Sequence, residues 1–148
     1  MAKFKISEVV DPSANMTVLL GASTSTPLND NDIGKPLKWA GTDRYVLCAN
    51  GDPIEGFLAS VQDATADGYA VGTMIAAKSG TLKRVELDGA VTLGAYVEAA
   101  APAAVNTAEA NGLGKVSVRA TPVAGDNHWR LVSGTGLDGD TTAVVMCV

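Results

Sequence analysis

The stretch TLKRVELDGAVTL, residues 81–93, decides the fold class. Apolar Val85 and Leu87 alternate with charged residues on both sides, which is the two-residue period of a strand with one buried face. The Asp-Gly pair after Leu87 favours a tight turn, and apolar residues return at Val91. We therefore expect a strand, a turn and a second strand that pairs with the first.

Short apolar runs bounded by glycine, asparagine, aspartate or proline recur along the rest of the chain. They predict strands at residues 16–20, 36–41, 44–49, 54–61, 115–120, 128–132 and 141–148. Two glycines disfavour a helix in residues 64–77, so a loop followed by a strand is expected there. Pro102 similarly favours a strand, a bend and an extended segment in residues 95–105. So many short strands indicate a β-barrel or a β-sandwich.

The composition favours one small, mainly β domain. Of the 148 residues, 47% are hydrophobic but only 5% aromatic, and 16 are glycine. Small β-branched residues and glycine-rich turns suit short strands better than long helices. Residues 1–32, rich in Ser, Thr, Asn and Pro, are predicted to form an extended N-terminal arm plus the first strand. Residues 33–148 are predicted to form the barrel or sandwich, within a single domain overall.

The charge balance argues against nucleic acid and membranes as partners. The chain has 11 basic and 16 acidic residues, a net charge of −5. A surface of this sign repels a phosphate backbone and an anionic bilayer. Charged residues or glycines interrupt each apolar run well before the length of a membrane span, and Glu8 and Asp11 break any secretory core. We expect synthesis in the cytoplasm without export.

The residue types needed for catalysis are scarce. His128 is the one histidine, and Asp126 could orient it, but no serine lies in a Gly-x-Ser-x-Gly elbow. Cys48 and Cys147 lie in apolar runs without metal-ligand spacing, which indicates buried free thiols. Residues 134–139 match Gly-x-Gly-x-x-Gly, yet too few residues follow for a dinucleotide site, so a turn is expected. The sequence predicts no enzyme, with no catalytic residue, cofactor or metal.

A few apolar side chains are candidates for contacts with a partner. Trp39 and Trp129 are each flanked by a cation and could anchor an interface. The alternative is that each fills the end of a barrel, with its indole N–H bonded locally. At the N-terminus, Phe4 and Ile6 alternate with Lys3 and Lys5, and this arm could dock on a partner.

Three stretches together resemble a known family. They are DIGKPLKWAG at residues 32–41, YVLCANGDPIEGFL at residues 45–58 and TLKRVELDGAV at residues 81–91, with WRLVSGTG at residues 129–136 fitting more loosely. They are similar to the head-decoration, or capsid cement, proteins of tailed bacteriophages. The resemblance implies a small β-rich protein, often a trimer and sometimes a dimer, on the outer surface of the virion. It also implies binding to the major capsid protein, so that neighbouring shell subunits are clamped together.

We therefore expect a structural virion protein that binds the exterior of a phage capsid and stabilises it. The alternative is a ligand-binding β module on a virion, either carbohydrate-binding or adhesin-like. An exposed aromatic platform would favour that second function.

Overall fold

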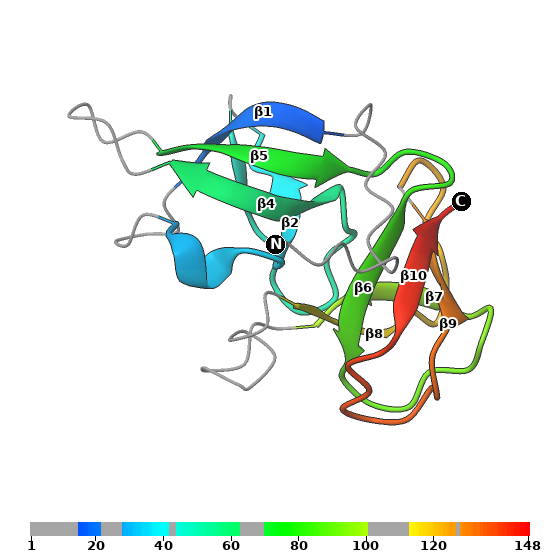
Figure 1. The fold of residues 1–148 in the computed structure, drawn as a ribbon. Helices are drawn as coiled ribbons and strands as arrows, with labels where there is room; N and C mark the ends of the chain where they lie inside the picture. The colour runs from blue at the N-terminus through cyan, green and yellow to red at the C-terminus, as the bar shows by residue number, and fades with distance from the viewer. Residues whose placement is uncertain (1–14, 22–27, 42–43, 63–69, 101–112, 127) are drawn as a thin grey trace.

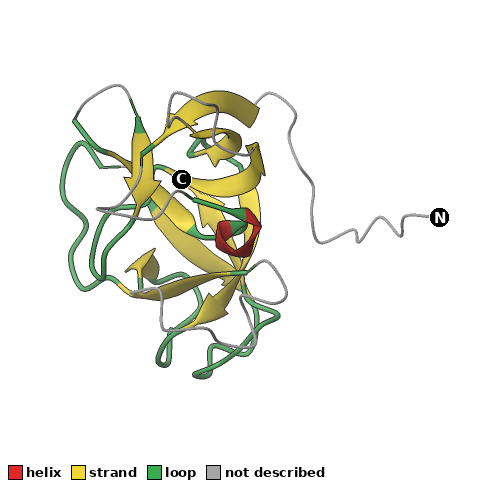
Figure 2. Ribbon diagram, turned by 90° about the vertical axis from the view of Figure 1, so that its left-hand side faces the viewer, coloured by secondary structure: helices red, strands yellow, loops and turns green. Residues whose placement is uncertain are grey.

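The described chain consists mainly of β-strands (Figure 1). The computed structural model describes residues 15–21, 28–41, 44–62, 70–100, 113–126 and 128–148. These residues form the strands β1 to β10 and a single turn of 3-10 helix, and strands dominate the view in Figure 2. The prediction of a mainly β, barrel-forming protein is confirmed. The strands close into two barrels, where the sequence predicts one barrel or sandwich.

The first barrel closes in the strand order β1-β3-β2-β4-β5. Its strands are β1 (Asn15–Leu20), β2 (Pro36–Trp39), β3 (Tyr45–Leu47), β4 (Gly56–Gln62) and β5 (Ala70–Ala76). β1 runs parallel to β3, while β2 to β5 are joined by antiparallel pairs and β5 returns antiparallel to β1. The 3-10 helix η2 (Asp30–Asp32) precedes β2, and the Asn29 side chain caps it by accepting a hydrogen bond from the N–H of Asn31.

The second barrel closes in the order β10-β6-β8-β7-β9. Its strands are β6 (Leu82–Leu87), β7 (Tyr96–Ala99), β8 (Gly114–Val118), β9 (Trp129–Ser133) and β10 (Val144–Cys147). Here β6 runs parallel to β8, and the other pairs are antiparallel. These strands lie at the sequence positions predicted from the glycine-bounded runs.

The two barrels have the same topology. Substituting β6 to β10 for β1 to β5, in order, converts the first strand order into the second. The register corresponds too, since the parallel pair joins Leu20 to Tyr45 in the first barrel and Leu87 to Val116 in the second. A register irregularity occurs at the same place in both, between β4 and β5 and between β9 and β10. The described part of the chain is therefore a tandem repeat of one five-stranded unit.

The correspondence continues into the loops. The Gly34 N–H donates to the carbonyl of Leu58 at 2.7 Å, and the Gly94 N–H donates to the carbonyl of Leu131 at the same distance. Gly34 and Gly94 have φ values of 92° and 85°. Glycine adopts such positive φ values without the steric cost that a Cβ brings. The same turn therefore introduces β2 and β7.

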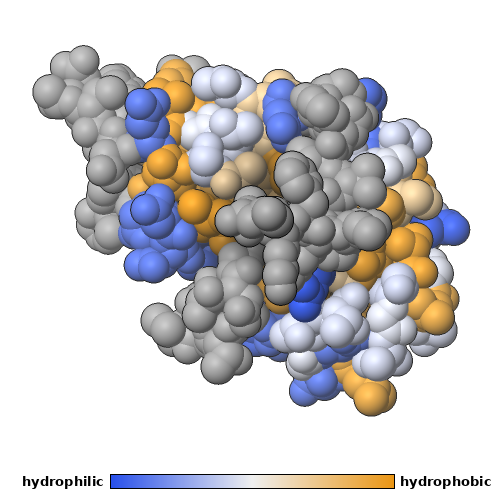
Figure 3. Space-filling view, in the orientation of Figure 1, coloured by the Kyte–Doolittle hydropathy of each residue, from blue (hydrophilic) through white to orange (hydrophobic). Residues whose placement is uncertain are grey.

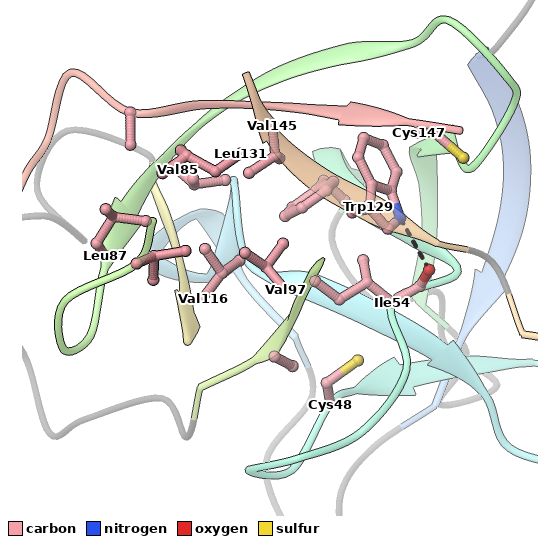
Figure 4. Close-up of a cluster of buried hydrophobic side chains, with 14 residues drawn as sticks. Cys48, Ile54, Val85, Leu87, Val97, Val116, Trp129, Leu131, Val145 and Cys147 are labelled. Carbon is pink, nitrogen blue, oxygen red and sulfur yellow. Dashed lines mark hydrogen bonds between the residues drawn. The ribbon is translucent and has the colours of Figure 1, made fainter. Parts of the chain in front are cut away.

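Two apolar clusters form the core. One fills the first barrel and contains Val18, Leu20, Leu28, Leu37, Leu58, Ala70 and Met74. The larger one fills the second barrel and continues onto residues of the first, namely Cys48, Ile54 and Phe57 (Figure 4). At this junction the rings of Phe57 and Trp129 meet edge to face, with centroids 5.1 Å apart. The two barrels thus share a core, and we expect them to unfold together.

Close backbone approach also joins the barrels. A Cβ added to Gly114, at the start of β8, would lie 2.4 Å from the carbonyl oxygen of Gly34. Such a distance leaves no room for a side chain. Glycine at position 114 therefore lets the second barrel pack directly against the segment before β2.

The predicted hairpin in residues 81–93 is wrong in its second half. The strand before the turn is β6, and Gly89 has the positive φ of a turn, 87°. Beyond it, the Val91 N–H donates to the carbonyl of Gly136 at 2.9 Å, and the Gly89 N–H donates to Asp138 Oδ1 at 2.8 Å. This segment therefore binds the loop after β9, and β6 pairs with β8 and β10 instead.

The predicted N-terminal segment is described only in part. Its strand at residues 16–20 is confirmed as β1, which lies between β3 and β5 in the first barrel. The predicted boundary between residues 32 and 33 falls inside that barrel. The arm, as far as it concerns residues 1–14, lies outside the described residues.

Candidate interaction surfaces

Trp129 lies in the core and cannot contact a partner. It is fully buried, at 0% exposure, and its Nε1–H donates to the carbonyl of Ile54 at 3.0 Å. The prediction that Trp129 anchors an external interface is therefore wrong. The alternative prediction, a tryptophan that fills a barrel with its N–H bonded locally, is confirmed (Figure 4).

Trp39 has the opposite environment. It ends β2, two residues beyond the fully buried Leu37, and 45% of its surface is exposed. Its ring meets that of Tyr45 edge to face, at a centroid distance of 5.2 Å. We call Trp39 and Tyr45 the aromatic end of the first barrel. An aromatic side chain held in one orientation and partly exposed is a typical interface anchor, and for Trp39 that role stays a prediction.

Charged side chains surround the aromatic end. The Lys38 ammonium forms an ion pair with the Asp52 carboxylate across the neighbouring turn. Burial raises the pKa of the Tyr45 hydroxyl, and the negative charge of Glu55 raises it further. Tyr45 is therefore a neutral hydrogen-bonding group at neutral pH, close to an acidic residue.

The other predicted contact residues are Lys3, Phe4, Lys5 and Ile6. They lie outside the described residues, and their docking on a partner stays a prediction.

An exposed apolar group lies on the second barrel. Leu93, Val132 and Leu137 are 58%, 42% and 65% exposed, and we call them the distal patch. Backbone hydrogen bonds hold their segments together, since the Gly94 N–H bonds to the carbonyl of Leu131 and the Val91 N–H to that of Gly136. Figure 3 shows hydrophobic residues at the surface of the second barrel, in the lower right of the view.

The carboxylate of Asp140 accepts four of the hydrogen bonds that fix the loop carrying Leu137. Asp140 Oδ2 accepts hydrogen bonds from the N–H and hydroxyl of Thr135, and Oδ1 accepts from the N–H and hydroxyl of Thr142 at 2.8 and 2.7 Å. Burial raises the pKa of the Asp140 carboxyl, but the bonds from Thr142 and Thr135 outweigh it and lower the pKa to about 2. The carboxylate is therefore charged at neutral pH and ties both ends of the loop.

Glycines shape the same loop. Residues 134–139 form a turn, as predicted, and no helix follows them in the described chain. Gly136 has a φ of 72°, and a Cβ there would lie 2.5 Å from the carbonyl oxygen of Val91. The glycines that match the dinucleotide motif thus have a structural role, since they form the tight turn that carries Leu137.

Cationic and aromatic side chains gather on the outside of the second barrel. The Arg130 guanidinium lies 4.3 Å from the centroid of the Tyr96 ring and donates to its hydroxyl. His128 meets the same ring edge to face and its Nε2 lies 3.1 Å from the carbonyl oxygen of Val123. Arg119 Nη2 donates to Asp126 Oδ2 at 2.7 Å. His128 and Asp126 thus have separate partners, and no nucleophile accompanies them among the contacts of the described residues.

Potential metal ligands do not cluster in the part of the chain that the structure describes. No group of three or more His, Cys, Asp or Glu side chains there could hold a metal ion. No helix there has the length and apolar character of a membrane span. Both cysteines are free and buried, as predicted, and burial raises the pKa of the Cys48 thiol to about 12.

Comparison with known proteins gives no match to a family model, a curated protein or a solved structure.

The distal patch was not predicted from the sequence, although one signal was present. Leu137 lies in GLDG, residues 136–139, where glycine and aspartate indicate a solvent-exposed turn. A large apolar residue at such a turn is a candidate contact. Leu93 and Val132 gave no comparable signal, because the bonds that bring them together join segments distant in sequence.

Proposed function

We propose that this protein is a structural virion protein that binds the exterior of a bacteriophage capsid and stabilises neighbouring major capsid protein subunits. Its place of action is the outer capsid surface, after synthesis in the host cytoplasm. The observation that carries the proposal is the distal patch, three exposed apolar side chains whose segments are joined by backbone hydrogen bonds; the loop that carries one of them, Leu137, is also fixed by Asp140. The resemblance of three sequence stretches to capsid cement proteins supports the same function.

The physical argument concerns preorganisation. Exposed apolar patches rimmed by polar residues are typical of protein interaction sites. A loop already held in one conformation loses little entropy when it binds, so more of the contact energy is available for affinity. Many copies on one shell then each add a modest contact, and occupied positions stabilise the assembled state.

Co-sedimentation tests the proposal. Capsids of the encoding phage, prepared without this protein, are mixed with the purified chain and pelleted. We expect the wild-type chain to pellet with the shells, and the double variant Leu93→Ser with Leu137→Ser to bind at least about tenfold more weakly. Met16→Ser, which removes a 46% exposed side chain from the first barrel, is the matched control and should bind normally. Absence of wild-type binding would contradict the proposal.

The second candidate is a carbohydrate-binding or adhesin-like module, and the exposure of Trp39 favours it. An exposed indole can stack on the apolar face of a sugar ring. The discriminating measurement is a glycan array probed with the wild-type chain and Trp39→Ala. Saturable binding that disappears in the variant would support this function, and an array without signal would leave capsid binding as the better account.

A further inference from the structure

The two barrels of one chain contact each other through the end of one strand and a turn. Ala99, which ends β7 in the second barrel, bonds through both backbone groups to a turn of the first. Its N–H donates to the carbonyl of Asp52 at 3.1 Å, and its carbonyl accepts from the N–H of Gly51 at 2.8 Å. The end of β7 therefore docks on the turn at residues 49–52.

Because the two barrels repeat one unit, each of the two contacting segments has an equivalent segment in the other barrel. Trp39 corresponds to Ala99, because Trp39 pairs with Tyr45 on β3 as Ala99 pairs with Val116 on β8. Both residues end the second strand of their barrel. The end of β2 is therefore the structural equivalent of the segment that docks.

The turn at residues 49–52 corresponds to residues 123–126. The Asp52 N–H donates to the carbonyl of Ala49, and the Asp126 N–H donates to that of Val123, both at 3.2 Å. The third residue of each turn is a glycine with positive φ, 84° at Gly51 and 94° at Gly125. The second barrel thus repeats the turn that receives the docking strand.

Within the described chain, neither the end of β2 nor the residue 123–126 turn takes part in such a contact. Trp39 is 45% exposed and Ala40 is also exposed, whereas Ala99 is fully buried. Val123 is 57% exposed, and Ala124 beside it is exposed as well. We propose that copies of this chain associate head to tail, with the end of β2 in one copy docking on the residue 123–126 turn of the next.

The chemistry of the two surfaces is complementary. The aromatic end presents Trp39 and Tyr45, with Glu55 close enough to act on Tyr45 electrostatically. The receiving turn presents the side chain of Val123, which is 57% exposed, and His128 lies beside it, with its Nε2 3.1 Å from the carbonyl oxygen of Val123. Contact between the exposed Trp39 ring and the exposed Val123 side chain would remove apolar surface of both from water, so this pairing suits a second copy of the chain.

A contact of this kind is heterologous, because the two copies use different surfaces. Repetition of such a contact produces a closed ring or an open chain, whereas a two-fold symmetric dimer joins identical surfaces. The inference concerns the purified chain alone and is independent of the capsid proposal.

Site-directed cross-linking distinguishes these arrangements. Two single variants, Ala40→Cys and Ala124→Cys, are treated with a short bifunctional maleimide, separately and as a mixture. The native thiols are buried and should not react. We expect covalent dimers in the mixture and none with either variant alone. Dimers of Ala40→Cys alone would show a symmetric contact and overturn the proposal, and so would a mixture without dimers.

Sedimentation velocity provides the second measurement, from about 5 to about 500 μM. We expect the wild-type chain to associate as its concentration rises, and Trp39→Ala to need at least about tenfold more protein for the same degree of association. Leu137→Ala, on the distal patch, is the control and should match wild type. Circular dichroism confirms that each variant is folded. A wild-type chain that stays monomeric throughout, or a Trp39 variant that associates normally, would contradict the proposal.

Discussion

The indole Nε1–H of Trp129, in the second barrel, donates a 3.0 Å hydrogen bond to the carbonyl oxygen of Ile54, in the first. Both residues belong to the cluster that fills the second barrel and continues onto the first. The bond therefore lies inside the shared core, where an unpaired carbonyl has no access to water. We therefore expect the folding of each barrel to depend on the other.

Trp129→Phe should destabilise the protein by about 1–3 kcal/mol, because it leaves the Ile54 carbonyl without its donor and removes apolar volume. Urea unfolding followed by circular dichroism measures this change in the free energy of unfolding. Trp39→Phe, at the exposed end of β2, is the control and should change it by less than about 0.5 kcal/mol. Both chains should unfold in one transition. Two separate transitions in the wild-type chain would contradict the shared core.

Asp140→Asn should cost about 2 kcal/mol of stability. An amide accepts hydrogen bonds through one oxygen only, so its NH₂ group would face the donors of Thr135 or Thr142. Thermal unfolding at neutral pH measures the loss. Asp138→Asn tests the neighbouring carboxylate, which accepts one bond from the Gly89 N–H, and should cost less. Equal effects of the two substitutions would argue against a special role of Asp140 in fixing the loop.

The lowered pKa of Asp140 predicts a particular dependence of stability on pH. The carboxyl has a pKa of about 2 in the folded chain and an ordinary value of 3.8. Its contribution is therefore fully present above about pH 4 and is lost as the pH falls toward 2. The difference in unfolding free energy between wild type and Asp140→Asn should shrink over that interval. A difference that stays constant from pH 6 to pH 2 would contradict the assignment.

The cysteines should be unreactive in the folded protein. Burial raises the pKa of the Cys48 thiol to about 12, the Asp52 charge adds to it, and burial also raises the pKa of Cys147. Both thiols stay protonated at pH 8, and the thiolate is the reactive form. We expect an aromatic disulfide reagent to titrate no thiol under native conditions and both thiols in denaturant. Rapid native reaction of either would show that its pocket opens.

Gly136→Ala should destabilise the distal loop more than Gly139→Ala. Both glycines have positive φ values, 72° and 74°, so alanine is strained at either position. Only at Gly136 would the new Cβ also collide, 2.5 Å from the carbonyl oxygen of Val91, while nothing lies within 4 Å of a Cβ at Gly139. The midpoint of urea unfolding should fall further for Gly136→Ala. Equal midpoints would contradict the close packing of the two loops.

The sequence predicted strand positions better than strand partners. Short apolar runs between turn residues mark where strands begin and end, and β1, β5 and β9 lie where these runs do. Partners depend on contacts between distant segments. The Asp88-Gly89 turn illustrates this, because the residues after it bind the loop at residues 136–138 instead of returning along β6.

The two tryptophans show a similar limit. Trp39 follows buried Leu37 by two residues and Trp129 precedes buried Leu131 by two, so alternation alone gives them the same orientation. They differ because the first barrel packs over Trp129 and nothing in the described chain covers Trp39 to that extent. The tandem repeat could not be predicted from the sequence either, because equivalent positions carry different residues. Equivalent positions share hydrogen-bond geometry while their side chains differ, as Trp39 and Ala99 do.

We propose that this chain stabilises a capsid by binding to its outer surface, and thermal genome release tests this proposal most directly. Undecorated capsids filled with DNA are heated with and without the purified chain, and release is followed with a DNA-binding dye. We predict a higher release temperature with the wild-type chain and no increase with the Leu93→Ser and Leu137→Ser double variant. An unchanged release temperature at saturating wild-type protein would contradict the claim.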